Sequence, residues 1–148
     1  MSVGELEEDV AIEFLSMETT VKELQALRRD VAQREPAARE VAAAGLFLAN
    51  FYSGVEGILK RLARYHRVPV PSGERWHVRL ARCFCEPPRR GLPCLLDNQL
   101  ATDLAAYRRF RHVVYHGYGF RLRWDDLLPG IERAADVLAR FRGRSRAT

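Results

Sequence analysis

The sequence predicts an all-α fold, an up-and-down bundle of four long helices and one short helix in a single domain over residues 1–148. Apolar residues recur every three or four positions along four long segments, which is the period of an amphipathic helix. No segment alternates apolar and polar residues as a strand does. The 148 residues, 47% of them hydrophobic and 29% charged, are enough for one hydrophobic core without metals or disulfides.

Two long helices are predicted in the first part of the chain. The first covers about residues 2–34 and carries the apolar stripe Val10, Phe14, Met17, Val21, Leu24 and Val31. Pro36 marks the break before the second, at about 37–66, whose two heptad lines are Val41, Leu48, Val55 and Leu62 beside Ala44, Phe51, Ile58 and Tyr65. Helices joined by so short a break should pack as an antiparallel hairpin. A glycine costs about 1 kcal/mol in a helix relative to alanine, so Gly45, Gly54 and Gly57 predict close helix contacts.

One short and two long helices are predicted in the remainder. Residues 68–73, VPVPSG, predict a loop, and residues 73–84 a short helix that carries Trp76, Leu80 and Phe84. Asp97 is the expected N-cap of a third long helix at about 98–116, whose inward residues are Leu100, Leu104, Tyr107, Phe110 or Arg111, and Val114. The glycines of HGYG end this helix. The last helix covers about 124–142, with the stripe Trp124, Leu127 or Leu128, Ile131, Ala135, Leu138 and Phe141, and we expect a frayed tail from about 143.

The charge is unevenly distributed and predicts a polyanionic partner. Residues 1–40 hold ten acidic and five basic side chains, whereas residues 41–148 hold nine acidic and nineteen basic ones. A basic region of this kind is typical of proteins that bind nucleic acid. The acidic amino-terminal sequence lacks the pattern of a secretory signal, and no run of about 18 apolar residues could span a membrane. Because the three cysteines are also an odd number, we expect a cytoplasmic protein without a disulfide framework.

Residues 107–120, YRRFRHVVYHGYGF, form the segment most indicative of chemistry. Arg111 precedes His116 by five positions, and Tyr118 follows two positions later. On an ideal helix the arginine and the histidine lie about 140° apart, so they do not share a face. They can still converge near the end of the helix, because the arginine is long and the histidine is terminal. This favours a cleft beyond the carboxyl end of the helix, or one between two molecules, over a groove along one helix.

An arginine and a histidine together suit the cleavage of RNA by its own 2′-hydroxyl. The histidine titrates near neutrality and can take or give a proton, and the arginine can hold the phosphate and stabilise its added charge. One proton must leave the 2′-oxygen and another must reach the departing 5′-oxygen. Two copies of His116 across a two-fold axis would serve both sides. No acidic cluster for magnesium is present, so we expect a metal-independent reaction without a cofactor.

Other candidates surround this motif. His112 and His116 have an i, i+4 spacing that can chelate zinc, but Cys83, Cys85 and Cys94 do not supply further ligands at a usual spacing, so we expect no metal site. His77, next to Trp76, is expected to anchor the short helix, with contact to substrate as the alternative. Four arginines are candidate contacts to the RNA backbone, with a solvated basic face as the alternative: Arg108, Arg109, Arg121 and Arg123.

The motif R-x4-H-x-Y, written here RHVVYHGY, resembles that of HEPN-domain toxins of the HepT type. Three blocks also follow the order and spacing of HepT-like ribonuclease domains: FYSGVEGILKRLARYH, RWHVRLARCF and YRRFRHVVYHGYGFRLRW. The resemblance covers about residues 5–142. One position departs from the commoner pattern, because His112 stands where asparagine often follows the arginine, and this leaves open whether His112 assists the chemistry or only packs.

The resemblance implies a fold, an activity and partners. HEPN domains are helical bundles that dimerise with the arginine–histidine motifs of both subunits at the interface, and such toxins cut RNA without metal. The resemblance therefore implies a homodimeric endoribonuclease toxin of a type VII-like toxin–antitoxin pair, with Arg111 and His116 as catalytic residues and His112 as an auxiliary candidate. Its antitoxin would be an MNT-type nucleotidyltransferase that transfers AMP to the tyrosine of the motif, which Tyr118 matches.

Two alternatives remain open at this point. The chain could be a non-enzymatic HEPN module that binds a nucleotide or a nucleotidyltransferase partner, or a structural helical adaptor. Each side chain of the motif also has a common structural use: an arginine in an ion pair, a histidine that caps a helix, and a tyrosine in half-buried packing.

Overall fold

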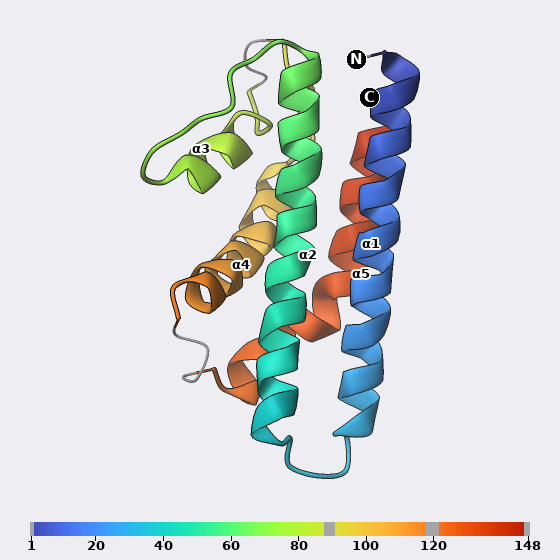
Figure 1. The fold of residues 1–148 in the computed structure, drawn as a ribbon, viewed down its shortest axis with the longest axis vertical. Coiled ribbons are helices and arrows are strands. Elements are labelled where there is room, and N and C mark those ends of the chain that lie inside the picture. The colour runs from blue at the N-terminus through green and yellow to red at the C-terminus, as the bar shows by residue number, and fades with distance from the viewer. Residues whose placement is uncertain (1, 88–90, 118–121, 147–148) are drawn as a thin grey trace.

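A computed structural model describes residues 2–87, 91–117 and 122–146. It contains five helices, α1 Val3–Asp30, α2 Ala38–Tyr65, α3 Trp76–Arg82, α4 Asn98–Tyr115 and α5 Trp124–Arg146 (Figure 1). The described residues form no β-strand, and the only bridge among them joins Cys85 to Leu96. The predicted all-α bundle of four long helices and one short helix is therefore confirmed.

Helices α1 and α2 form the expected antiparallel hairpin and lie side by side along the molecule (Figure 1). The Ser2 hydroxyl caps α1 by accepting a hydrogen bond from the Glu5 amide at 3.1 Å. In the connecting loop the Arg34 guanidinium donates two hydrogen bonds to the Glu40 carboxylate, at 2.6 and 2.7 Å. This pairing lowers the pKa of Glu40 to about 2. The short turn is thus held by charge-assisted hydrogen bonds at the start of α2.

Helix α4 crosses α2 on one side, and α5 packs against α1, α2 and α4 on the other (Figure 1). Asp97 caps α4 as expected, because its carboxylate accepts a hydrogen bond from the Leu100 amide at 2.8 Å. The Tyr107 hydroxyl joins α4 to α5 by donating to the Gly130 carbonyl at 2.7 Å. Burial raises the pKa of Tyr107, which keeps the phenol protonated as a donor.

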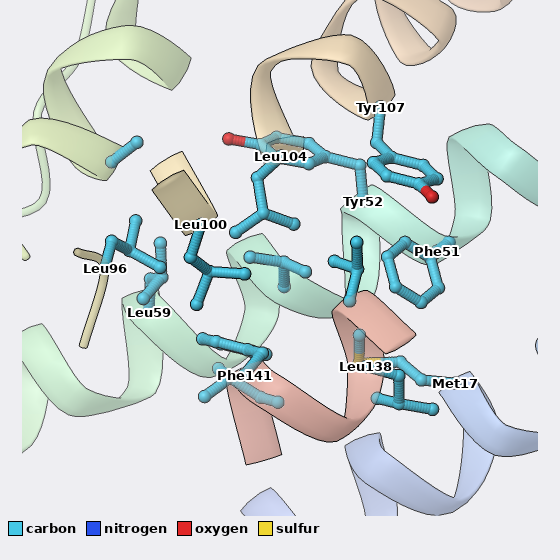
Figure 2. Close-up of a cluster of buried hydrophobic side chains, with 14 of the residues drawn as sticks. Met17, Phe51, Tyr52, Leu59, Leu96, Leu100, Leu104, Tyr107, Leu138 and Phe141 are labelled. Carbon is cyan, nitrogen blue, oxygen red and sulfur yellow. The ribbon is translucent and has the colours of Figure 1, made fainter. Parts of the chain in front are cut away.

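The hydrophobic core lies where α2 meets the other helices, and Figure 2 shows part of it around Phe51, Leu104 and Phe141. By length and composition alone α2 would suffice to cross a membrane. However, twelve of its residues are buried, and its partners in the bundle are α1, α3, α4 and α5. We therefore interpret α2 as the central core helix.

Two helix ends differ from the sequence prediction. Helix α1 ends at Asp30 instead of about residue 34, and α5 continues to Arg146 although a frayed tail was expected from about 143. The extra turn is tied down by Arg144, which donates hydrogen bonds to the Leu95 carbonyl at 3.1 Å and the Cys94 carbonyl at 2.6 Å. Contacts this distant in sequence leave no periodic signal.

Two of the three glycines inside α2 mark close contacts, one with another helix and one with the segment before α5. A Cβ atom on Gly45 would lie 2.3 Å from Leu122, and one on Gly54 would lie 2.6 Å from Met17, whose side chain is buried. At Gly57 a Cβ would lie 3.3 Å from the end of the Glu13 side chain, which can move. The expected close helix contact is therefore confirmed at Gly54. At Gly45 the close neighbour lies in the segment before α5, and the contact at Gly57 is looser.

We predict opposite effects on stability for Gly54→Ala and Gly57→Ala. The first should lower the free energy of unfolding by about 1–3 kcal/mol, because the methyl group overpacks the core. The second should raise it or leave it unchanged, because alanine gains up to about 1 kcal/mol of helix propensity. Urea denaturation monitored by circular dichroism measures the stability of both variants. Equal effects of the two substitutions would contradict the close contact between Gly54 and Met17.

Candidate active site

Arg111 points from α4 toward α2, with 24% of its side chain exposed. Its Nε lies 3.1 Å from Oε1 of Glu56 and donates a hydrogen bond to the Ser53 hydroxyl at 3.3 Å. Ser53 and Glu56 are three residues apart in α2 and therefore share a face of that helix. The guanidinium is thus attached to the core helix and is not free in solvent.

Glu56 is the one charged residue that is buried in the described part of the chain, with 3% of its surface exposed. A buried carboxylate is stable only when it is paired, because removal from water costs several kcal/mol per ion. Its Oε1 faces Arg111, and its Oε2 forms a short hydrogen bond with Nδ1 of His77. The carboxylate of Glu56 on α2 therefore contacts one side chain from α3 and another from α4.

His77 completes this cluster from α3. Its Nε2 lies 3.3 Å from Nη1 of Arg111. Its ring stacks on the neighbouring Trp76 ring with a centroid separation of 3.5 Å, and the Lys60 ammonium lies 4.2 Å from the centre of the Trp76 ring. His77 therefore anchors the short helix, as expected, and also contacts the motif arginine.

The basic residues expected at the rim occupy different environments. Arg108 is half-buried, and its positive charge acts on the phenol of Tyr52. Burial raises the pKa of Tyr52, and the charge of Arg108 opposes this rise. Arg109 and Arg123 are exposed, as a backbone-binding rim would need. Arg121 lies outside the described residues.

His116 stands at the C-cap of α4 and is exposed. Its Nδ1 lies 2.8 Å from the His112 carbonyl, and its ring packs on the exposed His112 ring with a centroid separation of 4.0 Å. Gly117 follows with a φ of +77°, the left-handed conformation that ends a helix and favours glycine. Tyr118, the expected modification site, lies outside the described residues.

Arg111 and His116 do not meet within one chain. No hydrogen bond, ion pair or ring contact joins them among the described residues, and Tyr115 stands beside the arginine. The Tyr115 ring lies 4.7 Å from the guanidinium carbon and is 55% exposed. This agrees with the expectation that the two motif side chains leave the helix on different faces.

The sequence interpretation missed Glu56 and Ser53. It expected His77 to anchor the short helix but did not predict its contacts with Glu56 and Arg111. A signal for Glu56 was present, because it is an acidic residue inside the apolar stretch GVEGIL of a core helix. Such a position indicates a charge that must find a partner. The partner itself could not be found from periodicity, because Arg111 lies 55 positions later in the chain. No group of three or more metal-ligating side chains gathers among the residues that the structure describes.

Comparison with known proteins gives one match. A family model described as HepT-like protein matches residues 43–147, which is more than two thirds of the chain. The matched segment contains Glu56, His77, Arg111 and His116. No curated protein and no solved structure matches the chain.

We predict that Arg111 and Glu56 are coupled in stability. Arg111→Ala should lower the free energy of unfolding by roughly 3 kcal/mol, because it removes the cation that lies beside the buried carboxylate of Glu56. The double variant Glu56→Gln/Arg111→Ala should lose less than the sum of the two single variants. Chemical denaturation of the wild-type protein, the two single variants and the double variant measures the coupling.

Arg109→Ala is the control on an exposed face of α4 and should change stability by less than about 0.5 kcal/mol. Additive losses would show that the pair does not form.

Proposed function

Because this chain belongs to the HepT-like family as a HepT-type HEPN domain, we propose that it is an RNA-cleaving toxin of a toxin–antitoxin pair. The observation that carries the proposal is the arrangement of the motif on α4. Arg111 is held against the core by Glu56, and His116 presents an exposed imidazole at the end of the same helix. A fixed cation and an accessible proton carrier are what phosphodiester cleavage requires.

Arg111 would bind the scissile phosphate and stabilise its added charge. A guanidinium offers five N–H donors in a planar fork, of which the Nε and Nη1 sides are directed at Ser53, Glu56 and His77. The structure contains no hydrogen bond from its Nη2 group to a described residue. The Nη2 group would therefore donate a hydrogen bond to a phosphate oxygen, an interaction for which arginine is well suited.

His116 would carry the protons through its Nε2 atom. A carbonyl oxygen only accepts, so the contact with the His112 carbonyl requires a proton on Nδ1. In the neutral imidazole the lone pair is therefore on Nε2, which can act as a base, and the protonated ring can act as an acid there. His112 assists by accepting through its carbonyl and stacking under the ring.

The complete site would require two copies of the chain. Tyr115 and Leu46 are two of the few large hydrophobic side chains that are exposed, at 55% and 46%. Leu46 follows Gly45 in α2, and Tyr115 follows Val114 in α4. A Cβ on Gly45 would lie at van der Waals distance from Val114, at 3.7 Å. Exposed apolar side chains beside the motif favour a homodimer interface at this end of the α2–α4 pair.

In the dimer the reaction would proceed without metal. The 2′-oxygen of a ribose attacks the adjacent phosphorus and passes its proton to Nε2 of one His116. The bond from phosphorus to the 5′-oxygen breaks, and the second His116 donates a proton to that oxygen. The products are a 2′,3′-cyclic phosphate and a free 5′-hydroxyl. Arg111 neutralises the charge that accumulates on the phosphate oxygens, and the exposed Arg109 and Arg123 would follow the RNA backbone.

The partner would be an MNT-type nucleotidyltransferase in the cytoplasm. Transfer of AMP to Tyr118 would place a phosphate two residues after His116. That negative group would compete with the RNA phosphate for the guanidinium of Arg111 and so neutralise the toxin.

A binding module without nuclease activity is the second candidate. The observation in its favour is that Arg111 already has an internal carboxylate partner, as a purely structural arginine would. Incubation of the purified protein with total RNA in EDTA separates the two candidates. Cleaved RNA with 2′,3′-cyclic phosphate ends supports the nuclease, and intact RNA supports the binding module.

We predict that His116→Ala abolishes RNA cleavage, with a loss of at least about 100-fold, because general acid–base catalysis contributes about 10²–10⁴-fold. Stability should not change, because the ring is exposed. His66→Ala is a matched control, since His66 is also an exposed C-cap histidine, at the end of α2. Equal cleavage by both variants would refute the assignment of His116.

We further predict that co-expression with an MNT-type nucleotidyltransferase increases the intact mass of the protein by one or more adenylyl groups. Peptide mapping should place the modification on Tyr118, and Tyr118→Phe should abolish it. Tyr65→Phe serves as the control tyrosine. Unmodified wild-type protein, or modification elsewhere in the chain, would contradict the proposed neutralisation.

A further inference from the structure

The imidazole of His77 lies between a carboxylate and a guanidinium, and these partners determine where its proton is. The Glu56 carboxylate only accepts hydrogen bonds, so Nδ1 of His77 must carry a proton in the short contact with Oε2. The Arg111 guanidinium only donates, so Nε2 of His77 must present its lone pair to Nη1, 3.3 Å away. The cluster therefore selects the neutral tautomer with the proton on Nδ1.

The other forms of the imidazole do not fit this cluster. A proton on Nε2 would point at an N–H group of Arg111, and a doubly protonated ring would add a positive charge beside it. The charged groups that face the ring are Glu56 from α2 and Arg111 from α4, and Lys60 of α2 lies over the adjoining Trp76 ring. With one carboxylate and two cations nearby, a neutral ring avoids an excess of positive charge.

The neutral ring acts as a bridge between α2 and α4. Its stacking on Trp76 at 3.5 Å fixes the ring plane, and its two nitrogens join the buried carboxylate to Nη1 of the arginine. Arg111 is thereby held at two points, at Nε by Glu56 and at Nη1 by His77. Two points of attachment determine the orientation of a planar guanidinium, which one ion pair alone would leave free to rotate.

We propose that Glu56 and His77 are positioning residues that fix the guanidinium plane of Arg111 and direct its Nη2 edge outward for the scissile phosphate. This inference rests on the proposed nuclease function and adds two residues to its machinery. His77 is not assigned to proton transfer, because both of its nitrogens are engaged and action on RNA would require release of Arg111. A misplacement of about 1 Å in a catalytic group can cost about 100-fold in rate, so this positioning matters for the reaction.

The tautomer can be measured directly on the full-length protein without RNA. Long-range proton–nitrogen correlation spectra of protein labelled with ¹⁵N-histidine distinguish a protonated from an unprotonated ring nitrogen, and His77→Gln identifies the signals. We expect a proton on Nδ1 and none on Nε2 of His77 at pH 7. A proton on Nε2, or on both nitrogens, would overturn the proposal.

Two amide substitutions of His77 test whether it positions Arg111, and the rate of RNA cleavage is the measurement. Glutamine at position 77 reaches about as far as Nε2 and can accept from Arg111, whereas asparagine reaches only as far as Nδ1. His77→Gln should therefore retain much more activity than His77→Asn, whose kcat should fall about 10–100-fold with little change in KM. Glu56→Gln should behave like His77→Asn, and His66→Asn is the control.

Thermal denaturation shows whether each variant is folded at the assay temperature. Equal kcat in the folded asparagine and glutamine variants would overturn the positioning role and leave the nuclease function standing. If the wild-type protein itself does not cleave RNA, the proposed function fails. In that case the spectra still decide whether His77 bridges Glu56 and Arg111.

Discussion

The paired carboxylate of Glu56 is the constraint on which the site depends. A charge inside a helical bundle cannot be left without a partner, and only 4% of the Glu56 side chain is exposed. The partners come from α3 and α4, so both helices are attached to the same carboxylate on α2. A short helix of seven residues, which would not be stable by itself, thereby acquires a defined place.

The two ends of the motif occupy different environments. Arg111 is half-buried and contacts Glu56 and His77, whereas His116 is exposed at the helix end, where the backbone turns through Gly117. Tyr115 lies between them with its ring over the guanidinium and much of its surface in solvent. A phosphate held at the fixed end and protons carried at the open end would divide the work of cleavage. This division also accounts for the lack of contact between the two side chains in one chain.

The fold was largely predictable because local signals agree with each other. The apolar stripes placed four long helices, and the caps at Ser2 and Asp97 follow common N-terminal patterns. Helix ends were predicted less well, because distant contacts such as those of Arg144 extend the last turn of α5. Within α5 the structure buries Ala134 and leaves Ala135 exposed, although Ala135 was expected to face inward. For the site, the spacing of Arg111 and His116 identified the motif and the separation of their faces. It did not identify the contact of Arg111 with Glu56 or the half-buried position of Arg108, because both depend on residues that are distant in the sequence.

The sequence by itself determined the helical bundle, the basic character and the arginine–histidine motif, since these depend on composition, on a period of 3.6 residues and on short spacings. Only the tertiary structure decided which side chains meet. Glu56, His77 and Arg111 lie in separate helices up to 55 residues apart, and the burial of one carboxylate draws them together. Burial is a property of the assembled core, so no local pattern in the chain could reveal that contact.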